Sequence, residues 1–362
     1  MQNKPYVWVG RFYNHSKDSI SLRLFRAARC FAGKIARKAV RKKYECDIEF
    51  TPANWAETAK VSEHSHNPVI TWIGHSTFLI QVGGINIITD PVFFNLSFFA
   101  PRVLKAGISI DQLPKIDFVI VSHNHMDHMD LRSIKMLNAK FQSTFLVPHG
   151  NKKWLEQKGI KNVIEKKWWE EQVFDIPESD ASQGDGSTSS PRARLFDGAR
   201  PEPVEGCEFQ KRSDSKFTFL PAVHWTSRGI LDINKTMWGS WMIEHAGFKI
   251  YFAGDTAYAD HFEKIGKIFH GIDIALMPIG PVQPRKLINE AHTCPMEAVR
   301  GFLDLDAKCF IPMHWGTFRS AYESFSSPAL GLLNSWKKFE DRLNGKSLKL
   351  LKVGESILFE QK

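Results

Sequence analysis

The sequence contains few cysteines and no long hydrophobic run. Five cysteines occur among 362 residues, none of them in a CxxC pair. This favours free thiols in a reducing compartment over a disulfide framework. No apolar segment reaches the roughly 18–20 residues that a membrane-spanning helix needs, which argues against an integral membrane protein. The opening MQNKPYVWVGRFYN lacks the apolar stretch and cleavage site of a secretory signal. These absences predict a cytoplasmic protein.

The remaining composition is that of an ordinary globular protein. Hydrophobic residues make up 43% and charged residues 24%, with 27 Phe and 11 Trp. A chain of this length can bury one large core or two small ones.

The net charge of +9 is concentrated at the amino terminus. Residues 1–43 contain 12 Lys and Arg but one acidic residue, whereas the rest of the chain is nearly neutral. Residues 20–43 show apolar positions at helical spacing opposite basic ones, which predicts an amphipathic helix. Such a helix can lie on an anionic membrane surface or pack as a solvated helix on the domain, and both alternatives stay open. The absence of interleaved basic and aromatic residues disfavours nucleic-acid binding. We therefore divide the chain into a basic arm at 1–50 and a domain at 51–362.

From about residue 68, short hydrophobic runs alternate with amphipathic segments. Runs bounded by Gly or Asp are typical of strands covered on at least one face. We expect strands at 69–73, 77–82, 85–89, 117–121, 143–147, 216–220, 239–245, 248–253, 272–278, 307–312, 348–352 and 355–359. We expect helices at 131–138, 151–158, 258–270, 295–304 and 328–343. The alternation predicts an α/β domain of two sheets with helices outside.

Residues 178–214 interrupt this pattern. The segment is rich in Ser, Gly, Pro and charge and has few large apolar side chains. Such a composition buries too little surface to offset the entropy of ordering. We expect a disordered surface insertion.

The strongest functional motif is VIVSHNHMDHMD at residues 119–130. A hydrophobic strand ends, and the following loop carries His123, His125, Asp127 and His128. Imidazole nitrogens suit zinc-like ions, and the added carboxylate suits a second ion alongside. Four potential ligands within six positions argue against an ordinary polar loop. The motif predicts a metal centre.

Three further candidate ligands each follow a hydrophobic strand. His224 follows FTFLPAV, Asp255 follows KIYFAG, and His314 follows CFIPM. Any one alone would be unremarkable, but together they complete two groups. The groups would hold one ion each: His123, His125 and His224 in the first, and Asp127, His128 and His314 in the second. Asp255 is the natural bridge, because a carboxylate can span two cations.

These motifs resemble the metallo-β-lactamase fold superfamily. Longer stretches, from about residue 50 to the carboxyl terminus, are similar to the N-acylphosphatidylethanolamine-hydrolysing phospholipase D family. The stretches are WIGHSTFLIQ, TDPVF, SHNHMDHMD, KKWWEE, HWTSR, WGSWMI, FAGDTAY, MPIGPVQPR, HTCPMEAVR and MHWGTF.

The resemblance implies a four-layer αβ/βα sandwich, made of two mixed sheets with helices outside, and a centre of two Zn²⁺ or other divalent transition metals. It implies a phospholipase D type phosphodiesterase that converts N-acylphosphatidylethanolamine, or a related phospholipid, to phosphatidic acid and N-acylethanolamine. Two cations about 3.5–4 Å apart can hold a bridging hydroxide that attacks phosphorus. Metal coordination lowers the pKa of such a water to about 7.

The resemblance also implies roles beyond metal ligation. Asp127 and Asp255 would guide the proton, and His292 would lie near the substrate phosphate or simply precede a helix. Asp90 and His75 would support the ligands from a second layer. Of the tryptophans, most would lie in the core and some in an acyl-chain cavity.

Two alternative functions are kept. One is a lactonase or sugar-phosphate hydrolase acting on a soluble substrate, which the flanking motifs disfavour. The other is a non-catalytic metal-binding protein of the membrane surface, which the complete ligand set disfavours. The expected partners are a phospholipid substrate, peripheral contact with the cytoplasmic membrane face and, by resemblance, a second copy of the chain.

Overall fold

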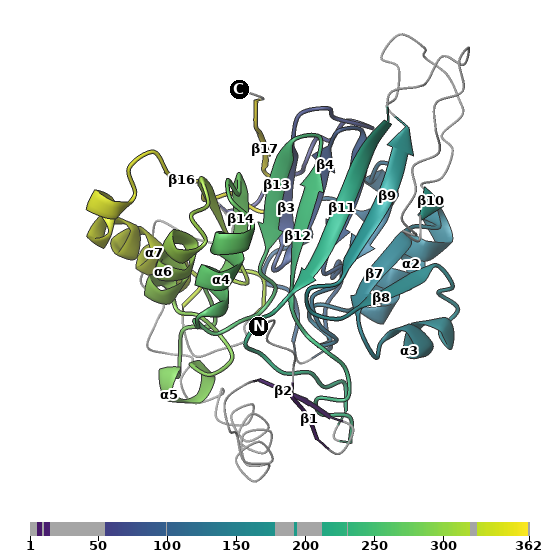
Figure 1. Cartoon of the computed structure of the whole chain (residues 1–362), viewed down its shortest axis with the longest axis horizontal. Coiled ribbons are helices and arrows are strands. Elements are labelled where there is room, and N and C mark those ends of the chain that lie inside the picture. The colour runs from purple at the N-terminus through teal and green to yellow at the C-terminus, as the bar shows by residue number, and fades with distance from the viewer. Residues whose placement is uncertain are drawn as a thin grey trace.

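The computed structural model describes residues 6–8, 11–14, 55–98, 100–177, 192–193, 212–229, 231–318 and 324–360. Two large mixed sheets face each other, and helices pack on part of the outer face of each (Figure 1). This arrangement confirms the predicted αβ/βα sandwich.

The first sheet contains seven strands. Their order across the sheet is β17 (Ser356–Leu358), β3 (Val69–Gly74), β4 (Thr77–Val82), β5 (Ile85–Thr89), β6 (Phe118–Ile120), β7 (Thr144–Pro148) and β8 (Val163–Lys166). Pairing is antiparallel from β17 to β5 and parallel from β5 to β8. The carboxyl-terminal strand thus pairs beside the first strand of the domain.

The second sheet contains eight strands. Their order is β10 (Arg192–Ala193), β9 (Glu171–Pro177), β11 (Arg212–Leu220), β12 (Ser240–His245), β13 (Phe248–Phe252), β14 (Ile274–Pro278), β15 (Cys309–Met313) and β16 (Ser347–Leu348). Pairing is antiparallel from β10 to β13 and parallel from β13 to β16.

Helices pack on the outer side of each sheet. Helix α2 (Leu131–Phe141) and α3 (Lys152–Glu156) pack on the first sheet, with Ile134, Leu137 and Leu155 in one apolar cluster with its strands. Helices α4 (His261–Ile268), α6 (Pro295–Asp304) and α7 (Ser327–Lys338) pack on the second sheet. Shorter helices are α5 (Arg285–Ile288), η2 (Ile110–Gln112) and η3 (Glu340–Arg342). No helix in the described part of the chain has the length and apolar character that crossing a bilayer requires.

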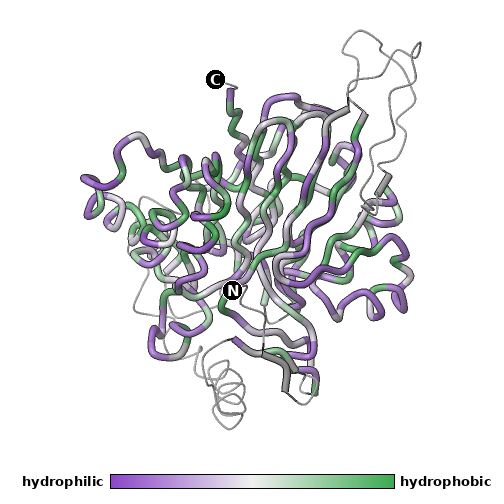
Figure 2. The backbone as a smooth tube through the Cα atoms, viewed as in Figure 1, coloured by the Kyte–Doolittle hydropathy of each residue, from purple (hydrophilic) through white to green (hydrophobic). Residues whose placement is uncertain are grey.

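The main core fills the space between the two sheets. The Phe118 and Phe217 rings, from opposite sheets, have centroids 5.0 Å apart. Trp72 and Trp241 are fully buried in the same cluster. Figure 2 shows hydrophobic segments along the central strands and hydrophilic ones on the outer loops and helix surfaces. Burial of this apolar surface fixes how the two sheets sit, and therefore how the loops at their shared edge meet.

The amino-terminal region contributes a small hairpin. Strands β1 (Tyr6–Trp8) and β2 (Arg11–Tyr13) pair antiparallel. The Phe12 N–H donates to the Asn234 carbonyl at 2.8 Å, so this part of the predicted arm packs on the domain. The predicted basic helix at 20–43 lies outside the described residues.

The boundaries predicted for the insertion need correction. Strand β11 begins at Arg212, so the carboxyl end of the 178–214 segment belongs to the second sheet. Residues Arg192 and Ala193 form β10, which pairs with β9. The rest of the segment lies outside the described residues.

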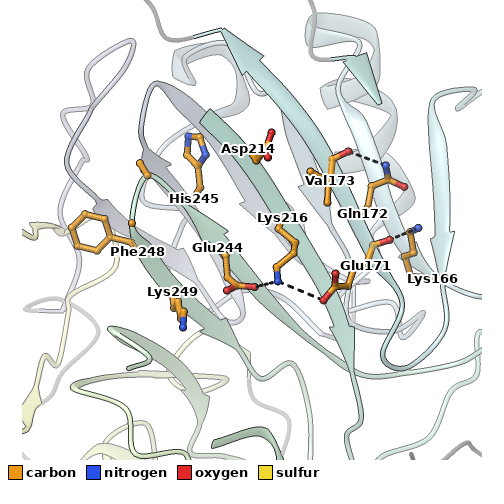
Figure 3. Close-up of a pocket in the computed structure, with 12 residues that line it drawn as sticks. Lys166, Glu171, Gln172, Val173, Asp214, Lys216, Glu244, His245, Phe248 and Lys249 are labelled. Carbon is orange, nitrogen blue, oxygen red and sulfur yellow. Dashed lines mark hydrogen bonds and ion pairs between the residues drawn. The ribbon is translucent and has the colours of Figure 1, made fainter. Parts of the chain in front are cut away.

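Part of the second sheet presents a polar outer face. Of the described helices, none lies over β9, β11 and β12 (Figure 1). There, Lys216 Nζ lies 2.8 Å from Glu244 Oε2 and 3.5 Å from Glu171 Oε1 (Figure 3). These ion pairs line a pocket of about 680 Å³ that contains none of the predicted metal ligands.

Candidate metal centre

The loop at residues 123–130 is a short, tightly hydrogen-bonded connection from β6 to α2. Inside the loop, the Met129 N–H donates to the His125 carbonyl at 2.8 Å. The Asp130 side chain then caps α2 by accepting from two backbone N–H groups of its first turn. Because the loop lies between a buried strand and a capped helix, its side chains have little freedom to reorient.

The structure brings the first predicted group together. His123 Nε2 lies 2.8 Å from His125 Nδ1, and His224 Nε2 lies 3.3 Å from the same Nδ1 atom. One ligating nitrogen from each residue lies within 4.8 Å of the others. His123 and His224 are buried, and His125 is half-buried. Three imidazole nitrogens around one point match the donor set of a zinc site.

The structure also brings the second predicted group together and adds a fourth side chain. Asp127, His128, His314 and His75 each direct a donor atom into one cluster within 4.8 Å. Asp127 Oδ2 lies 3.9 Å from the Nε2 atoms of both His128 and His314.

Asp255 lies between the two groups. Its Oδ2 atom is 3.0 Å from His314 Nε2 and 3.2 Å from His128 Nε2, both of the second group. The same oxygen is 3.8 Å from His224 Nε2, of the first group. The Asp255 carboxylate therefore faces nitrogens of both groups, and its role as a bridge between two ions stays a prediction.

Hydrogen bonds at Nδ1 set the neutral tautomer of two histidines. His224 Nδ1 donates to the Ala291 carbonyl at 2.9 Å. His128 Nδ1 donates to Asp90 Oδ2 at 2.7 Å. When neutral, each ring then carries its lone pair on Nε2, the atom that faces the cluster.

Asp90 supports ligands of both groups. Its Oδ2 accepts from His128 and also from the Ser122 hydroxyl at 2.6 Å, while Oδ1 accepts from the Ser122 N–H at 2.7 Å. Because the Ser122 hydroxyl donates to Asp90, it accepts from His123 Nδ1 at 2.9 Å. One fully buried carboxylate therefore orients a ligand in each group, as metal sites commonly require.

The electrostatics favour a divalent cation. Burial lowers the pKa of His125 to about 3 and that of His224 to about 4, so both rings are neutral ligands at pH 7. Burial raises the pKa of Asp127 and Asp255, but the histidines around them, led by His128, outweigh it and lower both values well below the usual range. Burial lowers the pKa of His128, and the carboxylates of Asp255, Asp127 and Asp90 raise it well above its ordinary value. Two ionised carboxylates beside the neutral rings of His125 and His224 form a cation-binding environment.

Several buried polar atoms of the cluster make no hydrogen bond with a described residue. They include Nε2 of His128, Nε2 of His314 and Oδ1 of Asp255. Buried polar atoms without a partner are rare in folded proteins, because each carries a desolvation penalty. All three belong to the expected ligand set, so the residues present fit a bound metal.

Of the remaining predicted residues, His292 borders the cluster, whereas His75, expected in a second layer, lies within the second group. His292 Nδ1 lies 3.6 Å from Asp255 Oδ2, and its side chain is 15% exposed. His75 Nε2 lies 3.3 Å from Asp127 Oδ2. His75, Asp90 and His314 have φ values of 57°, 31° and 60°, a region that non-glycine residues seldom adopt. Such strain concentrates at functional sites.

The structure distinguishes tryptophans of the core from one that lies beside the metal cluster. Trp168, Trp238 and Trp241 are buried, and each donates its indole N–H to a backbone carbonyl. Trp225 instead is half-buried, with its ring edge-on to His125 at a centroid distance of 4.3 Å. Trp225 therefore belongs to the wall of the site.

Two supporting residues lie within recognised motifs but were not predicted to have a role. One is Ser122, described above. The other is Arg228, whose Nη1 donates to the carbonyls of Asn124 at 3.0 Å and Met129 at 2.7 Å. An arginine four positions after a ligand gives no sequence signal for contact with a loop about 100 residues earlier.

A sandwich with a histidine- and aspartate-rich cluster at the edge of its sheets defines the metallo-β-lactamase class. Residues 85–315 match the family model described as "Beta-lactamase superfamily domain". The chain belongs to this superfamily. A solved metallo hydrolase from the archaeon Ignicoccus hospitalis has the same fold, with a TM-score of 0.54, 20% identity and coverage of 82% of this chain and 100% of that one.

Two curated relatives carry a more specific name. The chain is 32% identical to the mitochondrial N-acyl-phosphatidylethanolamine-hydrolyzing phospholipase D of Saccharomyces cerevisiae, over 78% of this chain and 55% of that protein. It is 32% identical to N-acyl-phosphatidylethanolamine-hydrolyzing phospholipase D 1 of Caenorhabditis elegans, over 68% of this chain and 64% of that protein. The chain thus spans slightly more than half the length of these relatives.

Proposed function

We propose that the protein is a zinc-dependent phosphodiesterase of the phospholipase D type. Its substrate is N-acylphosphatidylethanolamine or a related phospholipid, and its products are phosphatidic acid and N-acylethanolamine. The main support is the position of Asp255 Oδ2, within 3.8 Å of nitrogens from both histidine groups. The names of the two relatives support the choice of substrate.

The two groups would each hold one zinc ion. Zinc bound there supplies Lewis acidity and an activated water for attack on phosphorus. The ligands are His123, His125 and His224 for one ion and Asp127, His128 and His314 for the other, with Asp255 shared.

Asp127 and His292 are the groups best placed to act on the substrate. Asp127 can accept a proton from the attacking water, and His75 holds that carboxylate at 3.3 Å. The P–O bond to the N-acylethanolamine breaks as the new O–P bond forms, and the accepted proton passes to the leaving alkoxide. His292 is partly exposed, which suits a donor to a phosphate oxygen.

Contact with a membrane surface belongs to the same proposal, because a phospholipid substrate resides in a bilayer. The 12 basic residues within 1–43 support electrostatic attraction to anionic lipid. A homodimer and a cytoplasmic location remain predictions.

The test is mass spectrometry of the products formed from N-acylphosphatidylethanolamine in mixed micelles. Zinc-loaded protein is compared with His123→Ala and Asp255→Asn, which should both lose turnover and bind less metal. Phosphatidic acid with N-acylethanolamine, absent from both variants, would support the proposal. Turnover retained in either variant with normal metal content would overturn the assignment.

The same experiment separates the alternatives. Wild-type protein that binds about two metals but forms no lipid product would exclude the phospholipid as substrate. Hydrolysis of a soluble phosphate ester or lactone would then favour the soluble-substrate enzymes. Tight metal binding without turnover of any ester would favour a non-catalytic protein.

A further inference from the structure

The loop that carries His224 is closed at its base by paired polar residues. This His224 loop comprises residues 224–229 and 231–236. The Thr226 N–H donates to Asn234 Oδ1 at 3.1 Å, and the Asn234 N–H donates back to the Thr226 carbonyl at 2.8 Å. The Thr226 hydroxyl donates to the Thr236 carbonyl at 2.8 Å. The base of the loop is thus rigid, whereas its position on the domain depends on contacts with other elements.

The amino-terminal hairpin provides contacts at both ends of this loop. Asn14, just after β2, donates its side-chain Nδ2–H to the His224 carbonyl at 3.0 Å. The Phe12 N–H donates to the Asn234 carbonyl at 2.8 Å, and the Phe12 ring lies edge-on to His149 with a centroid distance of 6.0 Å. Figure 1 shows β1 and β2 beside the segment that joins β11 to β12, which includes this loop. Asn14 and the candidate ligand His224 are therefore in contact although they lie 210 positions apart in the chain.

The Asn14 contact acts on the backbone of a candidate ligand directly. The His224 ring is fixed at Nδ1 by the Ala291 carbonyl, and its backbone carbonyl is held by Asn14. Nε2 of the ring must stay within about the observed 3.3 Å of His125 Nδ1 for both to reach one ion. A shift of the backbone at His224 would move Nε2 out of this arrangement.

The amide orientation of Asn14 is specified by the same contact. If the amide were reversed, Oδ1 would face the His224 carbonyl oxygen, and two acceptors would repel. Asn14 is half-buried, so water cannot freely replace its donor. The contact is therefore a directed interaction that only a side-chain donor at this position can make.

We propose that the amino-terminal hairpin is a part of the metal centre, with Asn14 as the positioning residue for His224. The proposal rests on the proposed function only in requiring that His123, His125 and His224 hold a metal. It does not depend on the substrate. Removing the Asn14 donor should weaken metal binding at the His224 group by about tenfold, as supporting hydrogen bonds commonly do, and leave the second group unchanged.

The test compares full-length Asn14→Ala and Asn14→Asp with wild type. The aspartate keeps the shape of the side chain but has no donor for the His224 carbonyl. Asn162→Ala is a matched control. Asn162 Nδ2 also donates a hydrogen bond, to Thr144 Oγ1 at 2.7 Å, but at the first residue of β7, where none of the candidate ligands lies. Zinc affinity is measured by competition with a chelator, and Co²⁺ titrations record the visible absorption bands that report ligand geometry.

We expect about tenfold weaker zinc binding at one site in both Asn14 variants, altered Co²⁺ bands for that site, and wild-type behaviour in the control. Wild-type affinity and spectra in both Asn14 variants would overturn the proposal. Equal weakening at both sites, matched by Asn162→Ala, would overturn it too, because it would indicate general destabilisation. Lipid turnover by wild type, measured separately, decides the proposed function alone.

Discussion

Asp90→Asn is the substitution that most directly tests how the fold orients the metal ligands. The carboxylate accepts three hydrogen bonds: from His128 Nδ1, the Ser122 hydroxyl and the Ser122 N–H. An asparagine has nearly the same shape but replaces one acceptor oxygen by a donor. If Nδ2 takes the place of Oδ2, it faces two donors. If Nδ2 takes the place of Oδ1, it faces the Ser122 N–H.

The consequence for metal binding follows from the tautomer of His128. To relieve the first conflict, His128 must accept at Nδ1 and carry its proton on Nε2. Nε2 is the atom that lies 3.2 Å from Asp255 Oδ2 and would bind the ion. The second conflict leaves a buried donor unsatisfied, which costs about 1–3 kcal/mol. Either arrangement predicts that metal affinity falls by about 10- to 100-fold.

Chelator competition with zinc measures this effect, and Asp117→Asn is the control. Asp117 is a half-buried carboxylate that, like Asp90, accepts a backbone N–H, from Asn86 at 2.9 Å, but it lies just before the first residue of β6. The reasoning would be refuted by an Asp90→Asn protein that binds both metals as tightly as wild type. It would also be refuted if Asp117→Asn lost as much affinity, since the effect would then be unspecific.

Four further predictions concern stability and the membrane. Arg228→Ala removes donors from two metal-loop carbonyls and should lower the free energy of unfolding by about 2–3 kcal/mol in denaturant titrations; no change would show that the contacts are dispensable. Burial lowers the pKa of His261 to about 3, below its unfolded value near 6.5. The unfolded state therefore binds the extra proton, and stability falls as the pH drops from about 6.5 towards 3. With metal removed, His261→Gln should reduce that slope by up to about 1.4 kcal/mol per pH unit, and parallel curves would contradict this. Removing zinc from protein kept in free zinc at 100 times the dissociation constant should lower the unfolding free energy by about 2.7 kcal/mol for each occupied site, seen as a lower Tm; an unchanged Tm would argue against a site formed in the folded state. Changing Arg37, Lys38 and Arg41 to Glu, with the hairpin intact, should weaken co-sedimentation with anionic vesicles most at low salt, whereas unchanged binding would favour a helix packed on the domain.

Most regular elements could be predicted because their signal is local. The runs at 77–82 and 85–89 are β4 and β5, and residues 295–304 are α6. Strands β8 and β9 were missed. Strand β10 has two residues and exists through its pairing with β9, so no local pattern marks it. The hairpin strands have three residues each and depend on docking against Asn234.

The candidate ligands can be found without coordinates, because histidine and aspartate directly after apolar strands are a chemical signal of metal binding. Their arrangement depends on the folded chain, which places Asp255 between the two groups and Asp90 behind one histidine of each. The folded chain also brings Asn14 and Arg228 into contact with the metal-binding loops. These contacts join residues about 30 to 210 positions apart in the chain. Their meeting is set by the packing of two sheets around a common core, which no local stretch of sequence encodes.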